Sequence, residues 1–199
     1  MFYKISLGLF LMVGSLFFIL PKPAAAFWWF DKPQVATSSI SILDDQAKTN
    51  LAVKYKLWEV AFEKKDVEAV IASQDKFLFT VPEINYLFAT EVKNIKSPTL
   101  TDVGVTSSNG NINVAANFHK FISGRFSFIA KPVSVENKLR LQLMHVKFYG
   151  FSVPTAWLEE PVNNALDNYF SFLYKDSRYQ GFTFISNDNS LQFKPTFKK

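Results

Sequence analysis

The sequence predicts an α+β protein in which a curved antiparallel β-sheet of about five to seven strands wraps on amphipathic helices, preceded by an N-terminal helix. Three observations lead to this class. Apolar residues recur at helical spacing as far as residue 92, alternate with polar residues from residue 99, and return to helical spacing over 154–173. Alternating runs separated by turn residues are typical of antiparallel strands.

The first 26 residues predict export. Lys4 precedes an uncharged apolar run over 5–20, and residues 21–26, Pro-Lys-Pro-Ala-Ala-Ala, end in small side chains. This order is typical of a secretory signal peptide that is cleaved after Ala26. A retained membrane anchor is the alternative, since an aromatic cluster follows directly and such clusters favour the membrane–water interface. The candidate interface residues are Phe27, Trp28, Trp29 and Phe30.

The composition narrows the possible classes. The chain has no cysteine, so an exported form has no disulfide framework and no acylated lipoprotein cysteine. Without residues 1–26 the formal charge falls from +5 to +3, an excess too small to predict nucleic-acid binding but compatible with weak attraction to an anionic surface. The 22 phenylalanines require a large apolar interior or a groove with apolar walls.

The chain divides into three parts. Residues 1–26 are the signal peptide or anchor, and residues 27–42 are predicted to be a linker because they contain Pro33 and a polar Thr-Ser-Ser cluster. The remaining residues, 43–199, predict a single α+β domain whose sheet-and-helix core spans 75–195.

A leading helix is predicted over 43–64, because seven apolar residues fall on one helical face. These residues are Leu43, Ala47, Leu51, Tyr55, Trp58, Ala61 and Phe62. Lys54 lies in the same stripe, and its charged end is expected to reach past the apolar surface to water. The next segment, 66–73, fits either a short helix or a strand.

A capping box predicts where the second helix begins. Thr80 and Glu83 have the required spacing, and Phe79 and Ile84 stand at the positions of a hydrophobic staple around them. The pattern predicts a strand over 76–79 and a helix over 81–92.

The alternating region predicts consecutive strands. Asn109-Gly110 and Glu136-Asn137-Lys138 predict the turns between them. In the strand after the second turn, apolar residues occupy odd positions up to Leu143 and even positions from Met144. Such a change of face within one strand is what a β-bulge produces, so a bulge is predicted at this step.

The last helix is predicted to begin at Pro154 and to end near Leu173. Pro161 lacks a backbone donor, which predicts a kink or a fresh helix start. The polar face of this helix is expected to carry Glu160, Asn163, Asn164, Asp167 and Ser171. A hairpin with a turn at 187–189 is predicted to close the chain.

No motif in the sequence identifies an enzymatic reaction. His119 and His145 have no other histidine or cysteine at ligand spacing, so no metal and no cofactor is predicted, and His145 is expected to be a solvated strand residue. No nucleophile elbow and no Gly-rich phosphate loop is present. A Ser/His/Asp hydrolase stays an open alternative, since such triads are recognised by geometry.

Two adjacent carboxylate pairs fall at predicted helix starts: Asp44-Asp45 and Glu159-Glu160. The ordinary interpretation is a favourable interaction with the helix dipole. A glycosidase pair is the alternative, and nothing else in the sequence favours it.

The apolar face of the sheet has two possible uses. It ordinarily forms the core, but a sheet that stays open leaves a groove suited to acyl chains or to apolar segments of a partner. The candidate ligand-contact residues are Phe126, Phe128, Leu141, Val146, Phe148 and Trp157.

These features follow one another in an order that is similar to that of a known protein family. Thr80-x-x-Glu83 is followed by Ile84 and Asn85, then by a run of strands containing "KP" and "ENKLRLQLMHV", and then by "FSVP" at a helix start. This layout, over about residues 75–195, resembles small bacterial envelope proteins of the YpmS-like and YceB-like kind. Those are half-barrels of sheet curled around a helix, distantly similar to tubular lipid-binding domains.

The resemblance implies envelope localisation and binding of a lipid or lipid precursor, and it transfers no catalytic residue. It does not account for the helix at 43–64. The lipoprotein members carry a lipobox cysteine that this chain lacks, so their mode of anchoring does not carry over.

We therefore expect a non-enzymatic cell-envelope protein, secreted or membrane-anchored, that binds a lipid-like or other apolar ligand in a groove of the curved sheet. The alternative is a structural or protein-interaction module that docks another envelope protein through the 43–64 helix or a sheet edge. The expected partners are a membrane surface, a lipid-like ligand or an envelope protein, and not nucleic acid. A large exposed apolar stripe on the helix would favour the module, and a deep cavity under the sheet would favour ligand binding.

Overall fold

A computed structural model describes residues 43–94, 100–119, 123–187 and 189–198. The predicted signal segment, the linker and the candidate interface residues at 27–30 lie outside this range. In chain order the described elements are α2 (Asp45–Trp58), a π-helix (Glu59–Glu63), α3 (Val67–Ser73), a 3-10 turn (Gln74–Lys76), β1 (Leu78–Thr80), α4 (Val81–Asn94), β2 (Leu100–Ser108), β3 (Asn111–His119), β4 (Ser123–Val135), β5 (Lys138–Phe148), β6 (Phe151–Ser152), α5 (Ala156–Tyr174), β7 (Tyr179–Asn187) and β8 (Ser190–Phe197).

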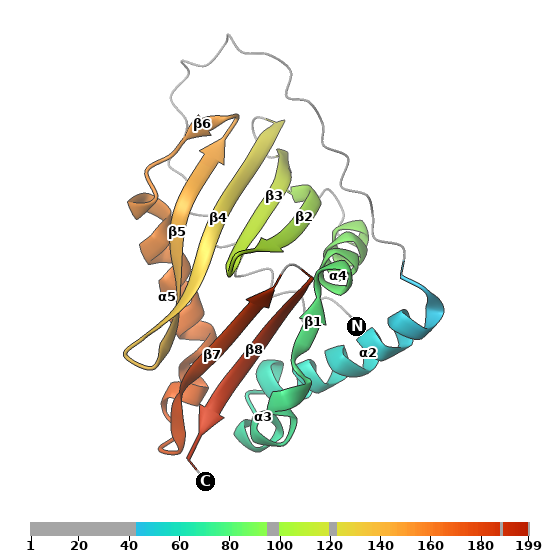
Figure 1. Cartoon of the computed structure of the whole chain (residues 1–199), viewed down its shortest axis with the longest axis vertical. Coiled ribbons are helices and arrows are strands. Elements are labelled where there is room, and N and C mark those ends of the chain that lie inside the picture. Colours follow the sequence, from blue (N-terminus) through green and yellow to red (C-terminus); the bar gives the residue numbers. More distant parts are fainter. Residues whose placement is uncertain (1–42, 95–99, 120–122, 188, 199) are drawn as a thin grey trace.

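The strands form two antiparallel sheets (Figure 1). The large sheet has the order β2-β3-β4-β5-β6, and the small sheet has the order β1-β8-β7. The α+β class, the curved antiparallel sheet and the leading helix are confirmed. The C-terminal hairpin does not extend the large sheet, because β8 pairs with the short strand before α4, where Phe79 stands opposite Leu191.

Both predicted turns of the large sheet are confirmed. Asn109 and Gly110 have φ values of 50° and 76°, and Glu136 and Asn137 have φ values of 50° and 62°. Two successive residues in the left-handed region form the type of turn whose twist matches that of the strands it joins. Asparagine and glycine enter this region at low cost, which explains three of the four positions.

The predicted β-bulge in β5 is confirmed. Ile129 stands opposite His145 and Ala130 stands opposite Leu143, so Met144 is the extra residue on β5. Because of this insertion, the buried residues change from odd to even positions along the strand. The bulge keeps one continuous apolar face while the strand bends.

Carboxylates cap the starts of α2 and α3. Asp44 accepts a hydrogen bond from the backbone N–H of Ala47 at 2.7 Å, which confirms the helix-start interpretation of this residue. The ambiguous segment 66–73 is helix α3, whose cap Asp66 accepts from the N–H of Ala69 at 3.1 Å.

Six large buried side chains lie between the small sheet, the N-terminal helices and α5. We call this group the aromatic cluster: Trp58, Phe62, Phe77, Phe170, Phe182 and Phe193. The ring centroids of Trp58 and Phe62 lie 4.1 Å apart, and those of Phe182 and Phe193 lie 4.4 Å apart. Aromatic pairs at such distances each add about 0.5–1.5 kcal/mol to the stabilisation that burial provides.

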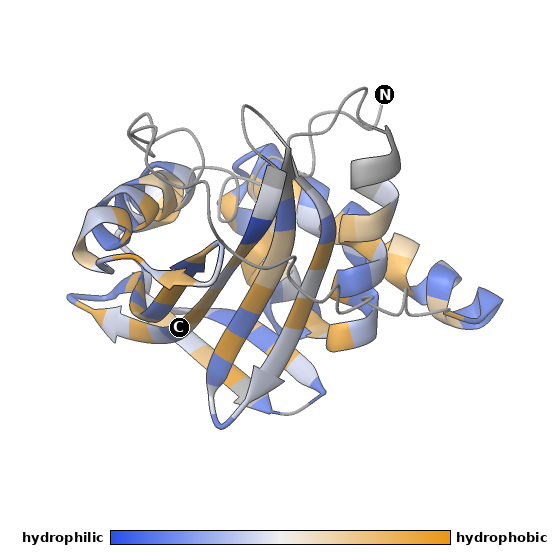
Figure 2. Ribbon diagram, turned by 90° about the horizontal axis from the view of Figure 1, so that it is seen from above, coloured by the Kyte–Doolittle hydropathy of each residue, from blue (hydrophilic) through white to orange (hydrophobic). Residues whose placement is uncertain are grey.

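The large sheet buries one face against the same core. Apolar and polar residues alternate along its strands, as the bands in Figure 2 show. The face turned toward the core, which we call the inner face, includes Val105, Val114, Ala116, Phe126, Phe128, Ala130, Leu139, Leu141, Leu143 and Val146. On α5, Leu158, Val162 and Leu166 join this core. Helix α5 runs through Pro161 without a fresh start.

At each side of the large sheet, an asparagine side chain from a flanking helix forms hydrogen bonds with both the backbone N–H and the carbonyl of one strand residue. At β2, Val105 donates its N–H to Asn85 Oδ1 at 2.6 Å, and Asn85 Nδ2 donates to the Val105 carbonyl at 2.9 Å. At β5, Leu141 donates to Asn163 Oδ1 at 2.8 Å, and Asn163 Nδ2 donates to the Leu141 carbonyl at 3.2 Å. Each amide thus replaces a neighbouring strand and protects the sheet edge.

The predicted polar face of α5 is therefore partly wrong. Asn163 contacts β5 rather than water, and Asp167 forms an ion pair with Arg140 at 2.7 Å. Asparagine and aspartate on a helix are compatible with water or with a strand edge, and only the fold decides between these environments.

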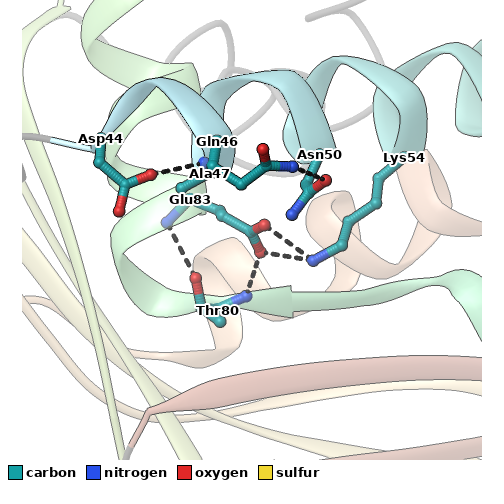
Figure 3. Close-up of polar contacts among 7 residues, drawn as sticks. All are labelled: Asp44, Gln46, Ala47, Asn50, Lys54, Thr80 and Glu83. Carbon is teal, nitrogen blue, oxygen red and sulfur yellow. Dashed lines mark hydrogen bonds and ion pairs between the residues drawn. The ribbon is translucent and has the colours of Figure 1, made fainter.

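Glu83 joins the capping box to α2 (Figure 3). Its Oε2 atom accepts from the backbone N–H of Thr80 at 2.7 Å, and the Glu83 N–H donates to Thr80 Oγ1 at 3.2 Å, which confirms the capping box. Lys54 does not reach past the surface as expected. Its Nζ atom lies 2.7 Å from Glu83 Oε1, and the carboxylate is buried.

Candidate functional site

Several aromatic residues occur in the segment where β5 turns into β6 and the chain enters α5. Figure 1 shows this segment at one end of the large sheet. Phe148 stands opposite Phe151 in the sheet, so both point to the inner face, as the buried Phe126 does. Trp157 lies in the first turn of α5. We call Phe148, Tyr149, Phe151 and Trp157 the aromatic end.

This end leaves apolar area in contact with solvent. Trp157 is 61% exposed and Phe151 is 38% exposed, whereas Phe148 and Tyr149 are half-buried. Single exposed apolar residues are common, but neighbouring ones of this size are typical of interaction sites. The aromatic end is therefore the strongest candidate for a binding surface in the described part of the chain.

Tyr149 adopts an unusual backbone conformation at this end. Its φ of 55° lies in the left-handed region, which a residue of this size rarely occupies. Its N–H donates to the Arg125 carbonyl at 2.8 Å, and its ring lies 4.6 Å from that of Phe148. The ring occupies the space above Gly124, where an added Cβ would lie 2.1 Å from it.

The hydroxyl of Tyr149 is buried and has no hydrogen-bond partner among the residues described. Burial raises the pKa of this tyrosine, so the hydroxyl stays protonated and keeps its donor. An unpaired buried hydroxyl costs about 1–3 kcal/mol relative to a paired one. A ligand that carried a polar group next to an apolar chain would satisfy it if the ring turned toward that ligand.

The six predicted ligand-contact residues divide into two groups. The buried group is Phe126, Phe128, Leu141 and Val146. Phe148 is half-buried and Trp157 is exposed, so these two are accessible. Sequence reasoning missed Tyr149 and Phe151, although the run of three aromatic residues around one glycine at 148–151 was a signal that this turn is apolar.

A shallow polar depression lies beside the aromatic end, at the start of α5. It has a volume of about 320 Å³. Its lining residues are Thr155, Ala156, Glu159, Glu160 and Asn163. Glu159 already accepts a hydrogen bond from the Leu143 N–H at 3.1 Å, so this carboxylate stabilises the contact between α5 and β5.

The titratable groups form no recognisable catalytic constellation within the described ranges. His145 is exposed on β5, as expected for a solvated strand residue. The described residues contain no group of three or more potential metal-ligating side chains. Tyr169 donates to Glu63 Oε1 at 3.0 Å, and burial raises the pKa of this tyrosine. That pair joins α5 to the π-helix rather than forming a cleft.

The surfaces proposed for a docking module are less apolar. On α2 the large exposed hydrophobic residue is Val53, at 58%, while Leu51 and Trp58 face the core. At the sides of the large sheet, the backbone groups of Val105 and Leu141 are occupied by Asn85 and Asn163. None of the helices that the structure describes combines the length and the hydropathy needed to span a bilayer.

Comparisons with protein-family models, with curated proteins and with solved structures found no match. The interpretation of the aromatic end therefore depends on its geometry.

Proposed function

We propose that this chain is a non-enzymatic protein of the cell envelope that binds a lipid-like molecule at its aromatic end. One observation carries the proposal. Trp157 is 61% exposed in the first turn of α5, six residues after the exposed Phe151, and the half-buried Phe148 stands opposite Phe151 in the sheet. An acyl chain laid across these rings would remove apolar area of both partners from water, at about 0.8 kcal/mol for each buried methylene.

The surroundings of this surface support an amphiphilic ligand. Phe148 and Phe151 continue the inner face of the sheet, so a chain bound to them lies against the buried wall that begins at Phe126. The unpaired hydroxyl of Tyr149 is buried beside this surface, and it becomes a donor for a polar group of the ligand once the ring turns toward the bound chain. The proposed contact set is thus Phe148, Tyr149, Phe151 and Trp157.

Displacement of a fluorescent fatty acid tests this proposal in the full chain. We expect the double variant Trp157→Ala, Phe151→Ala to bind at least about tenfold more weakly than wild type, because several buried methylenes lose their contacts. Val53→Ala is the matched control, since it removes a similarly exposed apolar side chain from α2. Equal affinity in the double variant and the control would overturn the proposal.

Native mass spectrometry of protein purified from the source envelope provides an independent test. The expected result is a population with an additional mass of lipid size, which decreases in the Trp157→Ala, Phe151→Ala variant. A chain that is always ligand-free, together with no displaceable fluorescent lipid, would contradict ligand binding.

Envelope localisation is tested by fractionation of source cells with an antibody to the described domain. We expect the protein in the envelope fraction rather than the cytosol. The mass of the mature chain distinguishes the two forms of export, since cleavage after Ala26 leaves a protein that begins at Phe27. A full-length protein in the cytosolic fraction would contradict the proposal.

A further inference from the structure

The net charge of this chain is concentrated in one segment. Residues 103–158 contain six Lys and Arg residues and one Asp or Glu, whereas the rest of the chain contains sixteen of each sign. The formal charge of +5 therefore falls within the segment that builds most of the large sheet. Strands β3, β4 and β5 contain no aspartate or glutamate.

The strand register places three of these cations on one side of the sheet. Residues on β4 and β5 that alternate with the buried ones point away from the core. We call this side the outer face and define it by Arg125, Lys131, His145 and Lys147. Lys131, His145 and Lys147 are exposed.

The carboxylates near the outer face leave most of its charge uncompensated. Asp102 lies at its border and accepts a hydrogen bond from Asn117 Nδ2 at 2.7 Å. Asp167 of α5 pairs with Arg140 at 2.7 Å, which withdraws that guanidinium toward the edge of the sheet. Within the described residues, Lys131 and Lys147 have no carboxylate at ion-pair distance.

We propose that the outer face docks on a lipid bilayer that contains anionic lipids. Exposed cations on a sheet are attracted to an anionic leaflet within about a Debye length, ~8 Å at physiological ionic strength. Met144, exposed between these cations, adds an apolar side chain suited to the interface. This mixture favours a bilayer over nucleic acid, whose phosphates would gain nothing from the methionine.

This inference does not depend on ligand binding at the aromatic end. The cations belong to the side of β4 and β5 opposite to Phe148 and Phe151. Lipid docking through the outer face and lipid binding through the aromatic end can therefore fail separately.

Lysine footprinting of the full chain tests the docking surface. The protein is mixed with phosphatidylcholine vesicles or with vesicles that contain one-third phosphatidylglycerol, and acetylation of each lysine is measured by mass spectrometry. With the anionic vesicles we expect Lys131 and Lys147 to react about fivefold more slowly, an effect that high salt removes. Lys56 and Lys64, exposed on the N-terminal helices, are internal controls and should not change.

Charge reversal provides the second arm. Lys131→Glu with Lys147→Glu should weaken binding to the anionic vesicles by about tenfold, whereas Lys56→Glu with Lys64→Glu changes the net charge equally and should alter binding by less than about twofold. All four substitutions are at exposed positions, so circular dichroism should show folded proteins.

Three outcomes would overturn the inference: equal protection of all four lysines, equal loss of binding in the two double variants, or equal protection of Lys131 and Lys147 by duplex DNA. The Trp157→Ala, Phe151→Ala variant separates the two proposals. If it keeps wild-type affinity for the fluorescent lipid while the outer-face lysines are protected, the proposed function fails and the docking surface stands.

Discussion

Trp58 and Trp157 show that the two ends of this molecule use aromatic residues in opposite ways. Trp58 is 7% exposed and contacts four rings, those of Phe62, Phe77, Phe79 and Phe193. Trp157 is 61% exposed at the start of α5. The same residue type therefore stabilises the fold at one end and offers a contact surface at the other.

The difference follows from what surrounds each helix position. Trp58 is the last residue of α2. This helix lies between α4 and the small sheet, so Trp58 meets neighbours on several sides. Trp157 precedes the buried Leu158 by one residue, so it points about 100° away from the core-facing side of α5. An apolar residue outside the apolar stripe of a helix is the feature that distinguishes a contact residue from a core residue.

Truncation of the aromatic cluster should give the largest effect. Phe62→Ala removes a ring that is almost fully buried, and we expect a loss of about 3–5 kcal/mol in the free energy of unfolding. Trp157→Ala should cost less than about 0.5 kcal/mol, because an exposed side chain leaves no cavity. Urea denaturation of both variants measures the contrast, and similar losses would show that the two ends are not different.

Removal of the ion pair between α2 and α4 should give the next largest loss of stability. Glu83→Ala removes the capping contact and leaves Lys54 unpaired, so we expect a loss of about 3 kcal/mol. Glu83→Gln retains the capping geometry and should cost about half as much. Glu160→Gln is the exposed control. Equal stability of the alanine and glutamine variants would indicate that capping contributes nothing.

The two asparagines that occupy the sheet edges should contribute equally. Asn85→Ala and Asn163→Ala each leave a backbone N–H and carbonyl without a partner, and we expect a loss of about 1–3 kcal/mol for each. Asn164→Ala, at the exposed neighbouring position on α5, should change stability by less than about 0.5 kcal/mol. Hydrogen exchange at Val105 and Leu141 locates the effect, and unchanged exchange at both amides would contradict it.

Alkaline pH should lower the free energy of unfolding by a smaller amount. Burial raises the pKa of Tyr174 to about 12, whereas an unfolded tyrosine titrates near 10. Below pH 10 both states are protonated, so this residue adds no pH dependence. Between pH 10 and about 12 the unfolded chain ionises first, and the folded state loses stability. Tyr174→Phe should show a shallower loss over this range, and an unchanged alkaline profile would count against the effect.

Local patterns in the sequence were sufficient to predict the helix start, the turns and the bulge. They were insufficient to predict which distant segments contact one another. The capping box at Thr80, the turn at Asn109 and the bulge at Met144 depend on neighbours within a few residues, and each was predicted correctly. The pairing of β1 with β8 and the contact between Lys54 and Glu83 join distant segments, and no local pattern encodes them. The same limit applies to Asn163, which local periodicity assigned to the polar face.

The candidate site shows the same division. Phe148 and Trp157 were predicted as contact residues and are accessible, but their exposure depends on how far α5 covers β5. Phe126 and Leu141 have the same apolar character and lie in the core. Alternation identifies the face of a strand, whereas coverage by a helix decides whether that face can meet a ligand.

Tryptophan fluorescence of the full chain with Trp28→Phe and Trp29→Phe tests the central claim most directly, because only Trp58 and Trp157 then emit. Addition of vesicles that contain brominated lipids should quench the exposed indole and leave the buried one unchanged. Replacement of Trp157 by phenylalanine should abolish the quenching, which is the result that lipid contact at the aromatic end predicts. Quenching that persists after this replacement, or that never occurs, would contradict the account.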